Sequence, residues 1–518
     1  MKLQRSQNTV RNIKVSLVGQ IISLLGPFTV RTVFIKTLGA EYLGLNSLFT
    51  SVLSVLSLAE LGFGSAIAFS LYGAISRDDT ELICAILQYL KKVYRIIGCI
   101  ILTIGFTIIP ILKYLVNGSY PGDINEIVIY LIFLGNSVLG YFLFGYYYSL
   151  ISAFQRNDVI SRIGIYMNLA MYVLQITLLL SVKNYYAYIS IMPVFTIFSN
   201  ITTALVAKKI FPQYYPNGAL NKEIRGDIKE KVGGLMIQKV CQVSRNSLDS
   251  IFISAFLGLT EIAIYNNYYY IMNSVNGLFS IVTSAMMAGA GNSVASETAE
   301  KNLCDMNKMN FAYMWLGGWC ACCLLCLYQP FMKIWMGEEL MLPSSTAFLL
   351  CLYFYVLRMG DVRGLYADAR GLWWQQRFRA ILEATSNIIL NYFMGKAWGY
   401  NGIIAATMIS LFIFNFCYGS TIVFKHYFGN ENCKDYFKFH AKTLIINAVV
   451  CVATFAVCSF LPKTLLGFIC KIVICCILPN LLLLLIYRRT KAYRDSVPWA
   501  AERVGIKEGS RIWKLLLG

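Results

Sequence analysis

Two long apolar segments carry polar and ionisable side chains at spacings of three and four residues, which places those side chains on one face of a helix. In residues 10–35 they are Ser16, Gln20, Ser23 and Arg31, with Pro27 on the same face. In residues 232–257 they are Gln238, Gln242, Arg245 and Asp249. Such groups either bond one helix to another, with Arg245 and Asp249 as an i, i+4 pair, or line a cavity that admits water or substrate. Because both segments have an equivalent polar face, the pattern favours a shared central cavity.

Three further apolar segments contain polar groups. The segment "LSLAELGFGSAIAFSLY" (56–72) places Glu60 near its middle, with Gly62 and Gly64 just beyond, where glycine lets a helix bend or pack closely. In residues 343–369, Arg358 and Asp361 have the i, i+3 spacing of an ion pair, and residues 363–370 predict a cytoplasmic rim. In residues 262–290 one side carries Asn266, Asn273, Gly277, Ser280 and Ser284.

The elements that must position these groups are membrane-spanning helices. The chain has 518 residues, of which 57% are hydrophobic and only 14% charged, whereas about 25% are charged in a typical soluble protein. Because about 20 apolar residues cross a bilayer as a helix, the sequence predicts an all-α polytopic membrane protein with about fourteen transmembrane helices. The predicted spans are 10–35, 43–75, 93–112, 124–153, 159–182, 186–207, 232–257, 262–290, 309–328, 343–369, 380–393, 401–424, 444–460 and 465–487.

The positions of Lys and Arg predict the orientation, since positively charged loops stay in the cytoplasm. With the N-terminus inside, about six of the 45 basic residues fall in outer loops. Both termini are therefore predicted to be cytoplasmic. The net charge of +19 reflects this asymmetry and an attraction to anionic lipid headgroups, and it does not indicate nucleic-acid binding.

Sixteen cysteines are present, and the densest group is "WCACCLLC" (319–326). Its spacing resembles a metal or redox motif. The segment lies within a predicted span, however, and the only histidines in the chain are His426 and His440. We therefore interpret these cysteines as small buried apolar side chains and predict no metal site.

An internal repeat divides the chain. The segment "VFIKTLGAEYLGLN" (33–46) aligns with "IFISAFLGLTEIAIYN" (251–266) at an offset of 218 residues with two residues inserted, and Gln20 then aligns with Gln238. Both copies join the first and second helices of a half, so the halves are expected to be related by an axis along the membrane normal. The predicted domains are an N-terminal lobe (1–207), a cytoplasmic linker (208–231), a C-terminal lobe (232–425), and a region with two extra helices and a basic tail (426–518).

The stretch "LGAEYLGLNSLFTSVLSVLSLAELGFGSAIAFSLY" with the later "LKKVYRIIG" resembles the Wzx-type polysaccharide flippases of the MOP (multidrug, oligosaccharidyl-lipid, polysaccharide) exporter superfamily. The resemblance is specific over residues 38–98 and architectural over 1–425. It implies two six-helix lobes that move an undecaprenyl-pyrophosphate-linked oligosaccharide across the bacterial cytoplasmic membrane for cell-surface polysaccharide synthesis. Membrane lipids, a polysaccharide polymerase and glycosyltransferases are the implied partners. The last two helices resemble the extra pair of the peptidoglycan-precursor branch.

Together with the residue chemistry, this resemblance gives each polar group a role. Arg31 and Arg245 are the candidates for pyrophosphate binding, because guanidinium offers a forked set of donors to phosphate oxygens. Glu60 either exchanges a coupling H+ or Na+ or pairs with an arginine. The other substrate-binding candidates are Gln20, Gln238 and Gln242, and, for contact with the sugar, Asn266, Tyr269, Tyr270 and Asn273. Ion-coupling or gating candidates are Glu60, Asp249, Arg358 and Asp361. No cofactor other than the coupling ion is expected.

Other classes of function fit the sequence less well. A MATE-like drug antiporter shares the lobes but is expected to line its cavity with acidic groups, since its substrates are usually cations. A lipid II-type precursor flippase remains open because of the two extra helices. A membrane enzyme needs a catalytic outer loop, and all predicted outer loops are shorter than about 20 residues. A channel needs a filter-like loop, which the sequence does not contain.

Overall fold

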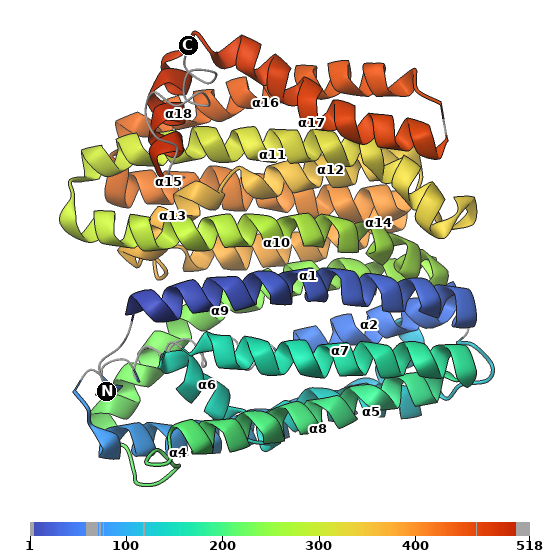
Figure 1. Ribbon diagram of the computed structural model, residues 1–518, viewed down its shortest axis with the longest axis vertical. Helices are drawn as coiled ribbons and strands as arrows, with labels where there is room; N and C mark the ends of the chain where they lie inside the picture. The colour runs from blue at the N-terminus through green and yellow to red at the C-terminus, as the bar shows by residue number, and fades with distance from the viewer. Residues whose placement is uncertain are drawn as a thin grey trace. The chain divides into compact units, whose positions relative to one another are not determined.

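The computed structural model describes residues 5–57, 71, 74–75, 77–117, 120–154, 156–462 and 464–503. Within these ranges the side chains of 5–18, 20, 227, 229–235, 237–240, 242, 244–246, 285, 288, 292, 295, 500 and 502–503 are not described. The described residues form helices and contain no strand (Figure 1). The predicted all-α polytopic fold is confirmed.

The described helices include ten that are long and apolar enough to cross a membrane, or eleven if α5 and α6, which meet at 52°, form one span. The described helices give fewer membrane spans than the predicted number of about fourteen, for three reasons. Only part of the predicted span 43–75 is described. The predicted span 232–257 lies in α9 (Lys222–Leu257), whose first turns are strongly charged. The predicted spans 380–393 and 401–424 run together into one helical stretch, Arg377–Phe428.

Packing divides the chain into two compact units, Met1–Ala263 and Ile264–Gly518. In the first unit α1 packs on α7, α5 on α4 and α8, and α2 on α9. Its helices are α1 (Arg5–Leu38), α2 (Ala40–Leu56), α4 (Thr80–Ile108), the 3-10 turn η2 (Ile109–Tyr114), α5 (Glu126–Phe142), α6 (Tyr146–Ala153), α7 (Asn157–Ser181), α8 (Tyr185–Ile210) and α9.

In the second unit α11 is the central helix and contacts α12, α13, α16, α17 and α18. The two appended helices, α16 and α17, lie beside α11 (Figure 1). The helices are α10 (Leu259–Ser296), whose first residues belong to the first unit, α11 (Ala299–Met336), η3 (Glu338–Leu340), α12 (Ser344–Arg358), α13 (Asp361–Arg370), α14 (Arg377–Ser410), the π-helix η4 (Leu411–Tyr418), α15 (Gly419–Val423), the π-helix η5 (Phe424–Phe428), η6 (Asn430–Asn432), α16 (Cys433–Ser459), α17 (Leu465–Tyr487) and α18 (Lys491–Arg503).

The break between the two predicted spans in α14 is present as a kink. Gly399 has φ 55° and ψ −130° within an otherwise continuous helix. A Cβ on Gly402 would lie 1.9 Å from the carbonyl oxygen of Met394, so the two helical segments meet too closely for a side chain there. Glycine is required at both positions, at the first for its dihedral angles and at the second for space.

The repeat found in the sequence appears as one backbone motif in two places. α1 ends at Leu38, Gly39 has φ 99° and ψ 174°, and α2 begins at the next residue. α9 ends at Leu257, Gly258 has φ 112° and ψ −179°, and α10 begins at the next residue. This region of dihedral angles is essentially restricted to glycine. The aligned Leu-Gly pairs therefore mark the same helix-to-helix turn in each half.

The boundary between packed units differs from the boundary that the repeat predicts. The repeat assigns α9 to the C-terminal lobe, whereas α9 packs within the first unit. A Cβ on Gly44 of α2 would lie 1.8 Å from the carbonyl oxygen of Leu259, which shows how closely the backbones approach. The backbone N–H of Asn117 also donates to the carbonyl oxygen of Ser254 at 2.9 Å. The repeat is a similarity of sequence, whereas the units are defined by packing contacts, so the predicted lobes stay a prediction.

The glycine turn gives a first prediction. Gly39→Ala should lower the free energy of unfolding by about 1–3 kcal/mol, because a side chain is strained at these dihedral angles. Nothing lies within 4 Å of the added Cβ, so the cost is backbone strain alone. Thermal unfolding of the purified protein in detergent measures it. Gly122→Ala is the matched control, since Gly122 also has open space and no positive φ. Equal thermal unfolding midpoints for Gly39→Ala and Gly122→Ala would contradict this explanation.

Candidate functional site

Several predicted site residues lie outside the described part of the structure. Glu60 lies in the undescribed segment 58–70. The side chains of Gln20, Gln238, Gln242 and Arg245 are likewise outside it, although α1 and α9 contain these residues. Their predicted roles stay predictions.

Arg31 is half-buried in α1, facing aromatic residues of the first unit. It interacts electrostatically with Tyr188 of α8, and Phe34, one turn further along α1, packs edge-on against the same ring with centroids 4.8 Å apart. Five residues before Arg31, a Cβ on Gly26 would overlap the ring of Tyr172 in α7. Close packing of α1 on α7 and α8 therefore places Arg31 beside the phenol of Tyr188.

The predicted sugar-binding residues occupy one face of α10. Asn266, Tyr269, Tyr270 and Asn273 follow the i, i+3, i+4, i+7 spacing, and they are half-buried except Asn273, which is exposed. The neighbouring Tyr268 is buried on the other face, where its hydroxyl donates to Gln329 of α11 at 2.7 Å. α10 thus anchors one face in the second unit, and its polar and aromatic face is half-buried, with Asn273 exposed.

Arg358 and Asp361 form the ion pair that their spacing predicts. Arg358 Nη1 lies 2.9 Å from Asp361 Oδ2, and the Tyr313 hydroxyl of α11 donates to the same carboxylate oxygen at 2.5 Å. The guanidinium also lies over the rings of Phe279 and Phe354, at 5.2 and 5.7 Å. An arginine with only 8% of its surface exposed is thereby neutralised by a carboxylate and by aromatic faces.

The prediction that residues 363–370 form a cytoplasmic rim is wrong for Arg363, which is buried. Its side chain is 2% exposed, while Asp368 and Arg370 further along α13 are exposed. Arg363 Nη2 donates to both the backbone carbonyl (3.2 Å) and the side-chain Oδ1 (3.1 Å) of Asn415. Asn415 lies in the π-helix η4, a wider turn that is frequent at functional sites. The sequence pattern could not show this burial, because it depends on an irregular turn in another helix.

A polar stripe along α14 was missed by the sequence analysis. Arg379 Nη1 lies 3.0 Å from Glu383 Oε2, one turn before Asn387, whose amide donates to Thr407 at 2.8 Å. Asn391 continues the stripe and donates to Asn387 at 3.3 Å. Glu383, Asn387 and Asn391 are buried, and the spacing of four residues from 379 to 391 was a readable signal.

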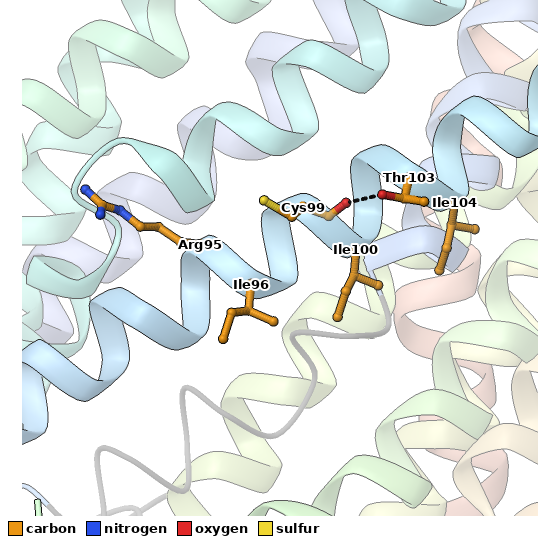
Figure 2. Close-up of a pocket in the computed structure, with 6 residues that line it drawn as sticks. All are labelled: Arg95, Ile96, Cys99, Ile100, Thr103 and Ile104. Carbon is orange, nitrogen blue, oxygen red and sulfur yellow. Dashed lines mark hydrogen bonds between the residues drawn. The ribbon is translucent and has the colours of Figure 1, made fainter.

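The α4 helix carries an apolar groove with a cation at one end. Its volume is about 420 Å³, and it is lined by Arg95, Ile96, Cys99, Ile100, Thr103 and Ile104 (Figure 2). Ile96, Ile100 and Ile104 recur every four residues and are 43–59% exposed. A charged head and an apolar stripe on one helix match an amphiphile that carries an anionic group on a long hydrocarbon chain.

The cysteines of "WCACCLLC" meet others that are distant in sequence. Cys322 and Cys326 of α11 form a buried cluster with Cys458 of α16 and Cys475 of α17. Sequence spacing could not reveal this, because the helices come together only in the fold.

Comparisons with known proteins identify the fold. Scans against protein-family models and curated protein sequences find no match. Among solved structures, the lipid II flippase MurJ in an inward closed conformation aligns with a TM-score of 0.70 and 14% identity over 92% of this chain and 99% of that chain. A mutant of the Vibrio cholerae MATE transporter VcmN aligns with a TM-score of 0.58 and 13% identity over 83% of this chain and 99% of its own. The chain has the fold of the MOP-superfamily transporters. A further neighbour is an inward-facing multidrug-resistance MATE transporter of the MOP superfamily, with a TM-score of 0.55 and 14% identity over 79% of this chain and 97% of that one.

The buried ion pair gives a second prediction. Asp361→Asn should lower the free energy of unfolding by about 3–5 kcal/mol, because it leaves the buried Arg358 charge without its carboxylate. The double variant Arg358→Met/Asp361→Asn should recover most of that loss. Chemical or thermal unfolding in detergent measures both variants.

Asp435→Asn is the control, because it removes one partner of an i, i+3 pair, Asp435 with Lys438, whose side chains are 79% and 78% exposed. No measurable change is expected there. A double variant as unstable as Asp361→Asn alone would show that the ion pair is not the source of the loss.

Proposed function

We propose that this protein moves an undecaprenyl-pyrophosphate-linked oligosaccharide from the cytoplasmic to the outer leaflet of a bacterial cytoplasmic membrane by alternating access. Such a substrate has an anionic head, a polar glycan and a very long apolar tail. Its carrier needs cations, hydrogen-bonding groups and an apolar surface open to lipid. The three kinds of surface are present on described helices of the MOP fold, on α1, α10 and α4.

The exposed face of α4 is the observation that carries the proposal: it bears a shallow, open groove whose described lining comes from this helix alone, with Arg95 at one end (Figure 2). Arg95 suits a phosphate because guanidinium donates a forked set of hydrogen bonds, and the stripe of Ile96, Ile100 and Ile104 suits a prenyl chain. On the predicted orientation Arg95 lies towards the cytoplasmic end of its helix, the side on which the substrate is made. Arg31 and Arg245 then receive the pyrophosphate, and the polar face of α10 receives the glycan.

A peptidoglycan-precursor substrate is the second candidate. The alignment with the lipid II flippase MurJ spans 92% of this chain, against 83% and 79% for the two MATE transporters. The helix pair α16–α17, which packs on α11, supports this candidate as well. In sequence it resembles the extra helix pair of the peptidoglycan-precursor branch. Both candidate substrates are sugars linked to a polyprenyl pyrophosphate, and both would bind the same cationic and apolar surfaces.

A MATE-like cation antiporter is the weaker alternative. The positive charges of Arg31, Arg95 and Arg245 attract an anionic head group and repel a cationic drug.

Coupling to H+ or Na+ is part of the proposal. Glu60, Asp249 and the Arg358–Asp361 pair are the groups assigned to it, because a carboxylate within a membrane is costly unless it is paired or protonated, and ionisable groups at such depth form proton and ion pathways.

The third prediction concerns Arg31. In cells that lack their own flippase for lipid-linked oligosaccharide, Arg31→Gln should reduce surface polysaccharide at least tenfold at equal protein level, since a charge-assisted hydrogen bond is worth about 1.5–3 kcal/mol. Arg31→Lys should restore part of it, because the forked geometry is lost but the charge is kept.

Lys36→Gln, an exposed cation in the last turn of the same helix, is the control and should complement fully. The same test applied to Arg245→Ala should give the loss seen for Arg31→Gln. Full complementation by Arg31→Gln and Arg245→Ala would remove both arginines from the mechanism, and failure of the unaltered chain to complement would overturn the substrate class.

The fourth prediction concerns the groove. Ile100→Trp places a large ring on the apolar stripe and should lower the rate of polysaccharide export several-fold by obstructing the prenyl chain. Val452→Trp, at an exposed apolar position of α16, adds the same ring away from the groove and should have no effect. Equal rates for both variants would exclude the groove from the substrate path.

A further inference from the structure

Three helices of the second unit bring a cluster of thiols together. Cys322 and Cys326 of α11, Cys458 of α16 and Cys475 of α17 are each no more than 3% exposed. Cys323 and Cys451 pack against them. The Sγ atoms of Cys326, Cys458 and Cys475 all lie within 4.8 Å of one another. We refer to these three residues as the thiol triad.

The geometry of the triad suits a metal ion with sulfur ligands. A Zn–S bond is about 2.3 Å, so thiolates that share one ion lie about 4 Å apart. The triad therefore reaches a coordinating geometry with shifts below about 1 Å, the scale of a rotamer adjustment. Cys322, one turn before Cys326 on α11, is placed to supply a fourth sulfur.

Neighbouring hydrogen bonds fix the helix that carries Cys475. The indole Nε1 of Trp319 donates to the backbone carbonyl of Cys475 at 2.8 Å, and the Cys323 thiol donates to the same oxygen at 3.7 Å. One turn before Trp319 on α11, Trp315 donates to Asn480 of α17 at 2.9 Å. These contacts lock the register of α17 on α11, so the sulfur positions are preorganised rather than incidental.

The charge of the surroundings also suits a cation held by thiolates. Lys471 lies one turn before Cys475 on α17 and offsets negative charge on the sulfurs. Cys458 lies one residue before the end of α16, which gives the cluster a short route to the α16–α17 connection. Soft thiolate ligands without oxygen or nitrogen donors select Cu(I) or Zn(II) over hard cations.

We propose that the thiol triad binds one soft d10 metal ion, Cu(I) or Zn(II), which joins α16 and α17 to α11. Binding replaces the thiol protons of the ligands, which are released to the buffer, and it involves no change of oxidation state. The ion holds the appended helix pair in place. This role is independent of the proposed transport substrate.

Metal content tests the proposal. The full-length protein, purified from cells grown with added zinc and copper, should contain about one ion per chain by mass spectrometry of the elements, and which element is present distinguishes Zn(II) from Cu(I). Cys458→Ser and Cys475→Ser should each reduce that content at least fivefold. Cys84→Ser is the matched control, because Cys84 is buried in α4 outside the cluster, and it should keep the ion.

A second readout does not depend on the variants folding. The unaltered protein, titrated with Cd2+ after chelation, should develop a thiolate charge-transfer band that saturates near one equivalent, and Zn2+ or Cu(I) should remove it. Chelation should lower the unfolding midpoint of the unaltered protein and of Cys84→Ser. The proposal is overturned if the unaltered protein holds less than about 0.1 ion per chain and gives no such band, since the cysteines then serve only as small apolar side chains.

Discussion

A charge inside a membrane protein must be paired or hydrogen-bonded where it lies, and this constraint organises the second unit. Arg358 meets Asp361 and the faces of two phenylalanines. Arg363 meets two oxygens of Asn415, which the π-helix η4 presents to it. The carboxylate of Glu383 meets Arg379. Because the partners of Arg358 and Arg363 come from α10, α12, α13 and η4, satisfying these two charges constrains how those helices pack.

The Arg358–Asp361 pair lies at a break between two helices, and α14 is itself broken along its length. α12 ends at Arg358 and α13 begins at Asp361, and the backbone carbonyl of Met359 between them accepts the hydroxyl of Tyr436 at 3.1 Å. α14 kinks at Gly399. A helix broken next to an ion pair changes its angle at a lower cost than a continuous one. This supports assigning gating to the Arg358–Asp361 pair, which is part of the proposed transport cycle.

Local sequence patterns predicted most of the fold and part of the site. Hydropathy located the spans, and the Leu-Gly pair of the repeat located two glycine turns, because both depend on residues close in sequence. The Arg358–Asp361 pair followed from i, i+3 spacing. The stripe from Arg379 to Asn391 was equally readable and was overlooked. The burial of Arg363 and the thiol triad could not be predicted, since each depends on helices that meet only through tertiary packing.

The central claim is that the polar and basic surfaces of this MOP fold carry a lipid-linked glycan. The direct measurement reconstitutes the purified protein in liposomes that contain a polyprenyl-pyrophosphate oligosaccharide and follows exposure of the glycan to a membrane-impermeant lectin. The account predicts protein-dependent exposure that an imposed H+ or Na+ gradient accelerates, with no movement of an organic cation in parallel liposomes. Movement of the cation without movement of the glycan would contradict it.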